Sequence, residues 1–156
     1  MAYVTLKYRA AALAAILAAV SPAVLHAQND GKAVETAHRE ILLQADQSWN
    51  GVAYTHYPTG QPELTMIKLT IAPHTVLPWH THPFPNAAYV LSGTLTVHER
   101  DTGKTKVYHQ GEAFAESVDT VHRGETGDEP VVLLITYSGT PGVPTSIPAK
   151  GQKPEY

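Results

Sequence analysis

The pattern that most constrains the fold of this chain is a period-two alternation of apolar and polar residues in short runs, which begins near Ile41. In segments 67–71 and 94–98, every second residue is apolar. Successive side chains of a strand point to opposite faces, so each segment predicts a strand with one buried face. The continuous apolar run 131–135 predicts a more deeply buried strand, and turn residues such as those at 101–103 separate the runs. The pattern predicts an all-β fold, a jelly-roll barrel, with no helix longer than two turns after Ile41.

The chain divides into four predicted segments. Residues 1–27 have the features of a signal peptide, with a basic start, an apolar run of 11 residues at 10–20 and a small residue at Ala27. That run is much shorter than the ~20 residues that span a bilayer, so we expect cleavage after Ala27 rather than a membrane anchor. Residues 28–40 form a flexible lead-in, 41–139 the β-barrel and 140–156 a proline-rich C-terminal tail that wraps the surface.

Charge and cysteine content exclude several classes of function. Because Lys7 and Arg9 lie in the signal segment, the mature chain keeps 9 of 11 Lys and Arg and all 14 Asp and Glu, a formal charge of −5. It has no basic stripe to neutralise phosphates, which argues against nucleic acid and against anionic membranes. The chain contains no cysteine, so neither disulfides nor thiolate metal ligands are available. We expect a periplasmic or secreted protein whose metal ligands, if any, are nitrogen and oxygen atoms.

Three histidines form a candidate metal site. His80 and His82 are two residues apart in a segment with strand character, so both imidazoles project from the same face and Thr81 from the other. His122 follows 40 residues after His82. From a neighbouring strand, it would complete a set of three protein ligands that leaves coordination positions open for water or substrate. Such an arrangement favours catalysis over a purely structural role.

The residues around these histidines resemble the two sequence motifs of the cupin superfamily. The first motif, H-x-H-x3,4-E-x6-G, is similar to the stretch from His80 to Gly93, with Asn86 at the glutamate position. The second, G-x5-P-x-G-x2-H, is similar to the stretch from Gly111 to His122. The resemblance extends roughly over residues 64–137 and implies a single-domain cupin barrel, of the small secreted type.

The chain departs from the family pattern at several positions. Ser117 and Asp119 stand at the proline and glycine of the second motif, and His74 at the glycine that opens the first. With Asn86 in place of glutamate, three neutral imidazoles leave a divalent ion close to its full charge, which favours anionic substrates. Asn86 is a candidate ligand or supporting residue. Glu116 is the candidate to supply the missing carboxylate, as a ligand or a general base, provided that its face of the strand is interior; the alternative is a surface glutamate.

Five large side chains are candidates for an apolar pocket around the metal: Trp79, Phe84, Tyr89, Met66 and Tyr137. The alternative for each is an ordinary place in the core. His98 lies on the polar face of its strand, which indicates solvent exposure.

The resemblance implies a divalent transition metal and chemistry on a small, anionic organic molecule. Fe(II) is favoured, for dioxygenase chemistry, while Zn, Mn, Ni or Cu and hydrolytic, lyase or isomerase reactions fit the same ligand set. The alternative is a non-catalytic cupin that binds or senses a small ligand, and fold analogy does not choose between them. Cupins often pair through edge strands, so the resemblance also implies a homodimer.

Overall fold

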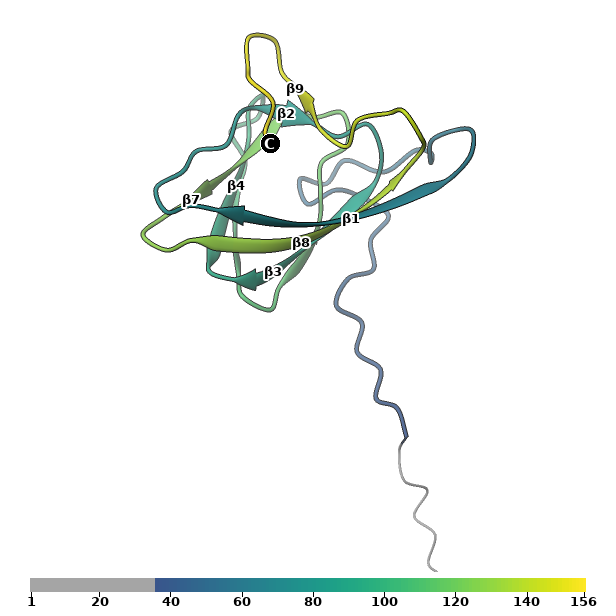
Figure 1. Cartoon of the computed structure of the whole chain (residues 1–156), viewed down its shortest axis with the longest axis horizontal. Coiled ribbons are helices and arrows are strands. Elements are labelled where there is room, and N and C mark those ends of the chain that lie inside the picture. Colours follow the sequence, from purple (N-terminus) through teal and green to yellow (C-terminus); the bar gives the residue numbers. More distant parts are fainter. Residues whose placement is uncertain (1–35) are drawn as a thin grey trace, which may run out of the picture. The chain divides into compact units, whose positions relative to one another are not determined.

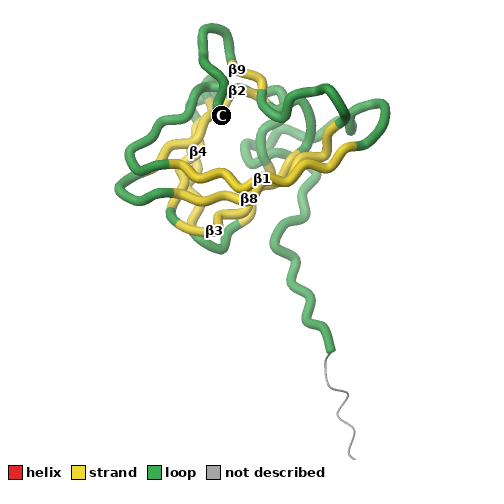
Figure 2. Tube along the Cα trace, viewed as in Figure 1, coloured by secondary structure: helices red, strands yellow, loops and turns green. Residues whose placement is uncertain are grey.

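The computed structural model describes residues 36–156, of which Arg39–Tyr156 form one compact unit. The predicted signal segment and most of the predicted lead-in, residues 1–35, lie outside the described residues. Strands and loops make up the described part, and residues 36–156 contain no helix (Figure 2). It follows that none of them belongs to a helix able to cross a membrane.

The strands form two antiparallel sheets, ordered β1-β8-β3-β6 and β5-β4-β7-β2-β9 (Figure 1). The first sheet contains β1 (Glu63–Ile71), β3 (Asn86–Ser92), β6 (Ala113–Ala115) and β8 (Val131–Gly139). The second contains β2 (His80–Thr81), β4 (Thr94–Glu99), β5 (Thr105–His109), β7 (His122–Thr126) and β9 (Ile147–Pro148). The predicted all-β barrel is therefore confirmed, with the predicted strands at 67–71, 94–98 and 131–135 inside β1, β4 and β8.

The two sheets enclose the core through the alternation that the sequence predicts. In β8 the odd-numbered residues are buried and the even-numbered ones are half-buried, since this strand lies between β1 and β3. In β4 the buried residues are Leu95, Val97 and Glu99. The inward-facing side chains of both sheets form one hydrophobic cluster, which includes Val90, Leu95, Val97, Phe114, Val131, Leu133 and Ile135.

The C-terminal tail, residues 140–156, returns to the barrel. Its strand β9 pairs with β2, where His80 lies opposite Pro148. This strand is at the edge of its sheet, which is where a proline is tolerated, because its missing N–H is not needed by a further strand. After β9, the Ala149 N–H donates to the Trp79 carbonyl at 2.8 Å, and the end of the chain lies close to β2 and β9 (Figure 1). The tail therefore covers the part of the second sheet that carries His80.

Candidate metal centre

The three histidines come together through strand pairing. His80 in β2 lies directly opposite His122, the first residue of β7, so their side chains share a face of the sheet. His82 follows His80 at the same-face spacing and forms an isolated parallel bridge with Val118 of the β6–β7 loop. The exposed fractions of His80, His82 and His122 are 3%, 2% and 2%. All three rings therefore lie inside the barrel.

A backbone carbonyl fixes the orientation of each imidazole. The Nδ1 atoms of His80, His82 and His122 lie 2.8, 2.6 and 2.9 Å from the carbonyl oxygens of Pro78, Thr145 and Thr120. A carbonyl oxygen only accepts hydrogen bonds, so each Nδ1 carries the proton and donates it. The lone pair of each neutral ring is consequently on Nε2. In metal sites, a hydrogen bond of this kind, made by the ring nitrogen that does not bind the metal, orients the histidine ligand.

The free nitrogens converge on one region. Ring centroids are 5.0 Å apart for His80 and His82, 4.5 Å for His80 and His122, and 5.0 Å for His82 and His122. One ligand atom from each of the three lies within 4.8 Å of those of the other two. This geometry suits binding of a single cation by three imidazoles.

Burial keeps two of the three rings neutral. Burial, together with the neighbouring histidines, lowers the pKa of His80 to about 3. Burial also lowers the pKa of His82 to about 4, although the carboxylate of Glu116 acts in the opposite direction. His122 behaves differently: its burial favours the neutral ring, but the adjacent Glu116 outweighs this and raises its pKa. At neutral pH, His80 and His82 are therefore ready to bind a metal without losing a proton.

Glu116 lies beside the three histidines. Its Oε2 atom is 3.2 Å from His122 Nε2 and 4.0 Å from His82 Nε2, and its side chain is 9% exposed. Burial alone would raise its pKa, but the contact with His122 dominates and lowers the pKa to about 2. The carboxylate is therefore ionised at neutral pH. Its position resolves the alternative left open by the sequence, because the face that carries Glu116 is interior.

Backbone contacts hold Glu116 in this position. Its N–H donates to the Asn86 carbonyl at 3.1 Å, and its own carbonyl accepts from the Tyr54 hydroxyl at 2.7 Å. Three residues further on, the Asp119 N–H donates to the His82 carbonyl at 3.0 Å. The β6–β7 loop is thereby attached to the His80–His82 segment, which keeps the carboxylate and the imidazoles in register. Tyr54 helps to hold Glu116 only through this tertiary contact, and no sequence motif indicates that role.

A second carboxylate, from the C-terminal tail, also enters the centre. Glu155 Oε2 is 3.4 Å from His80 Nε2, with 6% of the side chain exposed. Burial raises its pKa to about 7, and the negative charge of Glu116 adds to this effect. No sequence pattern indicates this residue, because it follows a run of prolines rather than a strand pattern. Three histidines and two glutamates therefore face one another in the barrel.

The space between these side chains is small. A cavity of about 20 Å³ is lined by His80, His122, Glu116 and Glu155 together with apolar core residues such as Leu77 and Leu95. This volume is close to that of one water molecule or one ion, and far below the roughly 300–1,000 Å³ of pockets for small organic ligands. With the tail in this position, a substrate-sized molecule does not fit beside the histidines.

Asn86 is buried next to this centre, at 5% exposed, and neither atom of its side-chain amide has a hydrogen-bond partner within residues 36–156. Of the five predicted pocket residues, Tyr137 and Phe84 are buried nearby. The Tyr137 ring centroid lies 5.6 Å from that of His82 and 6.4 Å from that of Phe84. The structure thus brings two of the predicted aromatic residues close to the histidines.

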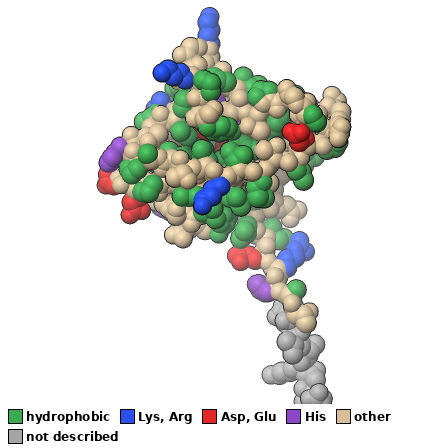
Figure 3. Space-filling model, viewed as in Figure 1, with side chains coloured by type: hydrophobic (Ala, Val, Ile, Leu, Met, Phe, Trp, Pro, Cys, Tyr) green, Lys and Arg blue, Asp and Glu red, His purple; other side chains and the backbone are tan. Residues whose placement is uncertain are grey.

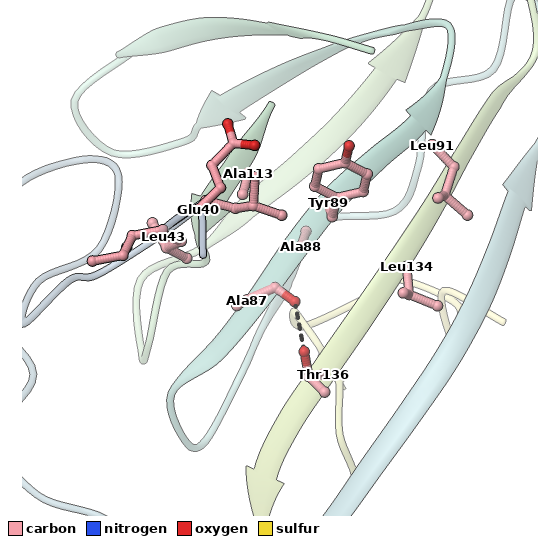
Figure 4. Close-up of a pocket in the computed structure, with 11 residues that line it drawn as sticks. Glu40, Leu43, Ala87, Ala88, Tyr89, Leu91, Ala113, Leu134 and Thr136 are labelled. Atoms are coloured by element: carbon pink, nitrogen blue, oxygen red, sulfur yellow. Dashed lines mark hydrogen bonds between the residues drawn. The ribbon is translucent and has the colours of Figure 1, made fainter. Parts of the chain in front are cut away.

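The other predicted pocket residues lie elsewhere. Trp79 stacks against Arg123, whose guanidinium carbon is 4.3 Å from the ring centroid. Met66 is 63% exposed, while its neighbour Ile67 packs against the core. Hydrophobic side chains are visible on the face of the molecule that the space-filling view presents (Figure 3). Tyr89 also points outward, and lines an open groove of about 720 Å³ with Glu40 and Leu134 (Figure 4). This groove is far larger than the histidine cavity, but it lacks converging charged groups, so the small histidine cavity is the better candidate for chemistry.

The donor set fits a divalent transition metal. Glu155 Oε2 is a buried atom without a hydrogen-bond partner in the described part of the chain, and it lies 3.4 Å from His80 Nε2. A neutral imidazole nitrogen and a carboxylate oxygen repel each other unless a proton or a cation lies between them. Imidazole and carboxylate donors suit Fe, Zn, Mn, Ni and Cu, and the two carboxylates would balance the charge of a divalent ion. The donor set does not distinguish among these metals.

Comparisons with known proteins agree with the architecture. A family model described as a cupin domain matches residues 67–137, while no curated protein sequence matches the chain. A structure reported with the DMSP lyases RdDddP and RnDddQII is 18% identical, with a TM-score of 0.50, and the match covers 56% of this chain and 44% of that one. At that level of identity the likeness bears on the fold alone.

Two further solved structures are similar. The polyketide cyclase RemF from Streptomyces resistomycificus is 22% identical, with a TM-score of 0.48 and coverage of 55% of this chain and 60% of that one. A cupin-like protein from Thermotoga maritima is 16% identical, with a TM-score of 0.47 and coverage of 55% and 64%. The matched part of this chain thus spans between 44% and 64% of the lengths of these three structures.

Proposed function

This chain belongs to the cupin superfamily through residues 67–137, and from that premise we propose that it is a metal-dependent enzyme acting on a small, anionic organic molecule. The observation that carries the proposal is the convergence of three buried imidazoles, each with its Nδ1 proton held by a carbonyl and its Nε2 lone pair directed inward. Such rigid, buried donors bind a metal without reorganisation, which is typical of a built site rather than of chance proximity.

The favoured reaction class is dioxygenase-like, with Fe(II) as the metal. Bound there, the metal would supply Lewis-acid polarisation or redox chemistry to a substrate oxygen. Glu116 is better suited to a ligand than to a general base, since its pKa of about 2 is far below the neutral range where bases work best. Its carboxylate also stabilises a proton on His122 Nε2. When a metal binds, His122 has to give up that proton. Metal binding should therefore release protons at pH values below the raised pKa of His122.

The competing proposal is a cupin that binds or senses a small ligand without turning it over. The 20 Å³ cavity does not separate the two proposals, because with the tail in this position it leaves no more room for a sensed ligand than for a substrate. The two proposals share the metal and differ in turnover.

We also propose export of the protein, with cleavage after Ala27, and a homodimer. The basic and apolar pattern of residues 1–27 supports export, and the exposed apolar side chains of β1, Leu64 and Met66, support association. N-terminal sequencing of exported protein tests the first proposal, and light scattering at known concentration tests the second.

Metal analysis of the purified protein tests the proposed function. His80→Ala, His82→Ala and His122→Ala should each weaken metal retention, because each removes one of the three converging nitrogen donors of the centre. His109→Ala is the matched control, since His109 is exposed and lies outside the centre. Full metal content in all three variants at the centre would refute the site.

Oxygen uptake then separates the enzyme from the binding protein. Wild-type protein loaded with Fe(II) should consume O2 in the presence of candidate enolates, diols or carboxylates, and His122→Ala should not. Metal retention and ligand binding without any turnover would favour the sensing proposal.

A further inference from the structure

We infer that Glu155, carried to the centre by the C-terminal tail, is an additional metal ligand. Its carboxylate occupies the coordination position that an anionic substrate takes. The inference rests on the proposed function, since it assumes the three-histidine metal site. Beyond the proposed function, it assigns a role to the tail and identifies the substrate group as one that replaces a carboxylate.

The distances around Glu155 match those of neighbouring ligands on one ion. Its Oε2 atom lies 3.4 Å from His80 Nε2, and Glu116 Oε2 lies 3.2 Å from His122 Nε2. With bonds of about 2.0–2.2 Å to the metal, adjacent ligand atoms of one ion are about 3.0–3.5 Å apart. Each glutamate oxygen therefore lies at the distance from a different histidine nitrogen that is expected when both atoms bind the same ion.

The burial of Glu155 needs an explanation that packing does not give. Its side chain is 6% exposed, its Oε2 atom has no hydrogen-bond partner in residues 36–156, and it lines the same cavity as Glu116. Two carboxylates that line one small cavity repel each other and lose hydration. The contact with His122 offsets this for Glu116. Glu155 Oε2, in contrast, faces His80 Nε2, which has no proton to donate. A divalent ion among the three histidines would neutralise both.

The tail that carries Glu155 is fixed by a few separable contacts. The Tyr156 hydroxyl lies 3.1 Å from both the Tyr137 hydroxyl and the Thr145 hydroxyl, and the Trp79 N–H donates to the Gln152 side chain at 3.3 Å. Beyond β9, no strand pairing holds residues 149–156 among the described elements. Since the cavity holds only about 20 Å³, a substrate has to displace the Glu155 side chain to reach the metal. A substrate carboxylate that takes its place keeps the charge of the centre unchanged.

Cobalt binding tests this role without relying on turnover. Metal-free wild type, Glu155→Gln, Glu155→Ala and the matched control Glu129→Gln, an exposed glutamate before β8, are titrated with Co²⁺ by calorimetry and visible absorption. Loss of one anionic ligand should weaken Co²⁺ binding in both Glu155 variants by about 10- to 100-fold and change the absorption spectrum, because the spectrum depends on the number of ligands. Glu129→Gln should match wild type.

Acetate distinguishes a ligand from a packing residue. Glu155→Ala leaves a space that acetate fits, so added acetate should recover Co²⁺ affinity and the wild-type spectrum in that variant and have no effect on wild type. The melting temperature of metal-free Glu155→Gln should equal or exceed that of metal-free wild type, since the amide removes a repelling charge.

Three results would overturn the inference. One is wild-type Co²⁺ affinity and spectrum in Glu155→Gln; another is a Glu155→Ala protein that acetate leaves unchanged. The third is a melting temperature of metal-free Glu155→Gln below that of metal-free wild type, which would identify a packing role. In each case Co²⁺ binding by wild type would leave the proposed function standing, whereas a wild type that binds no Co²⁺ would remove both.

Discussion

Asp119 and His74 are the non-glycine residues of the described chain that adopt a left-handed backbone, with φ of 60° and 52°. Both stand at positions where the cupin motifs carry glycine, which is the residue that takes positive φ without steric cost. Aspartate is among the residues that tolerate this region, because its short polar side chain can interact locally. The turn before His122 therefore keeps the shape that the family motif encodes, although its sequence differs.

Substitution at Asp119 should reveal this conformation. Asp119→Gly relieves the left-handed strain and should leave stability unchanged or raise it by up to about 1 kcal/mol, whereas Asp119→Val should lower it by about 1–2 kcal/mol. The side chain is exposed, so no packing change complicates the comparison. Urea unfolding of the metal-free proteins measures both values. Equal stabilities of the glycine and valine variants would contradict the role of the backbone angle.

The residues of the centre differ in how far the sequence identifies them. The spacing of His80 and His82 follows from strand geometry, whereas the expectation that His122 joins them rests mainly on the resemblance to the cupin motifs. For Glu116, alternation allows two faces, and only the tertiary fold decides that its face is interior. The position of Glu155 cannot be predicted from strand alternation, because it depends on how a proline-rich segment without periodicity folds back on the barrel.

At the scale of elements, the turn between β3 and β4 depends on Gly93. Its φ is 82°, and a Cβ atom there would lie 2.4 Å from the Pro130 carbonyl oxygen, well inside contact distance. Pro130 immediately precedes β8, so the close approach brings the β3–β4 turn against the start of the central strand of the first sheet. The glycine is required both for backbone angle and for space.

A pair of alanine substitutions separates these two requirements. Gly93→Ala should destabilise the protein by about 2–4 kcal/mol, the sum of left-handed strain and an unavoidable backbone clash. Gly103 in the β4–β5 turn is the control: its φ is 71°, but no atom lies within 4 Å of an added Cβ. Gly103→Ala should therefore cost only about 1 kcal/mol. Equal costs, measured by urea unfolding, would show that the Pro130 contact is unimportant.

Element prediction worked where one face of a strand is buried and failed to describe contacts made by edges and loops. Strands β1, β4 and β8 follow from alternation or from a continuous apolar run. Strand β2 lies in the segment around His80 for which the sequence indicates strand character, whereas the two-residue strand β9 has no period to detect and is not predicted. Proline indicated that the tail avoids central strands, which agrees with the edge position of β9, but it gave no indication that the same tail would reach the histidines.

At the scale of the whole molecule, the centre couples protonation to folding. In the unfolded chain all three histidines bind protons below pH 6.5. In the metal-free folded protein, burial lowers the pKa of His80 to about 3 and of His82 to about 4, so these two contribute stability that is lost as the pH falls from 6.5 toward those values. Burial raises the pKa of Glu155 to about 7, so its contribution has the opposite sign: stability is lost as the pH rises from about 4.5 to 7.

These contributions predict a definite pH dependence for the metal-free protein. Between pH 6.5 and 4.5, unfolding takes up two protons at His80 and His82 and releases one from Glu155, while His122, whose pKa is raised, is protonated in both states. One net proton makes the free energy of unfolding fall by about 1.4 kcal/mol for each unit that the pH is lowered. Glu155→Gln removes the opposing proton, so its slope in the same window should be about twice as steep. Urea unfolding at a series of pH values measures both slopes, and a wild-type protein whose stability rises on acidification over this range would contradict the assignment of neutral, buried His80 and His82.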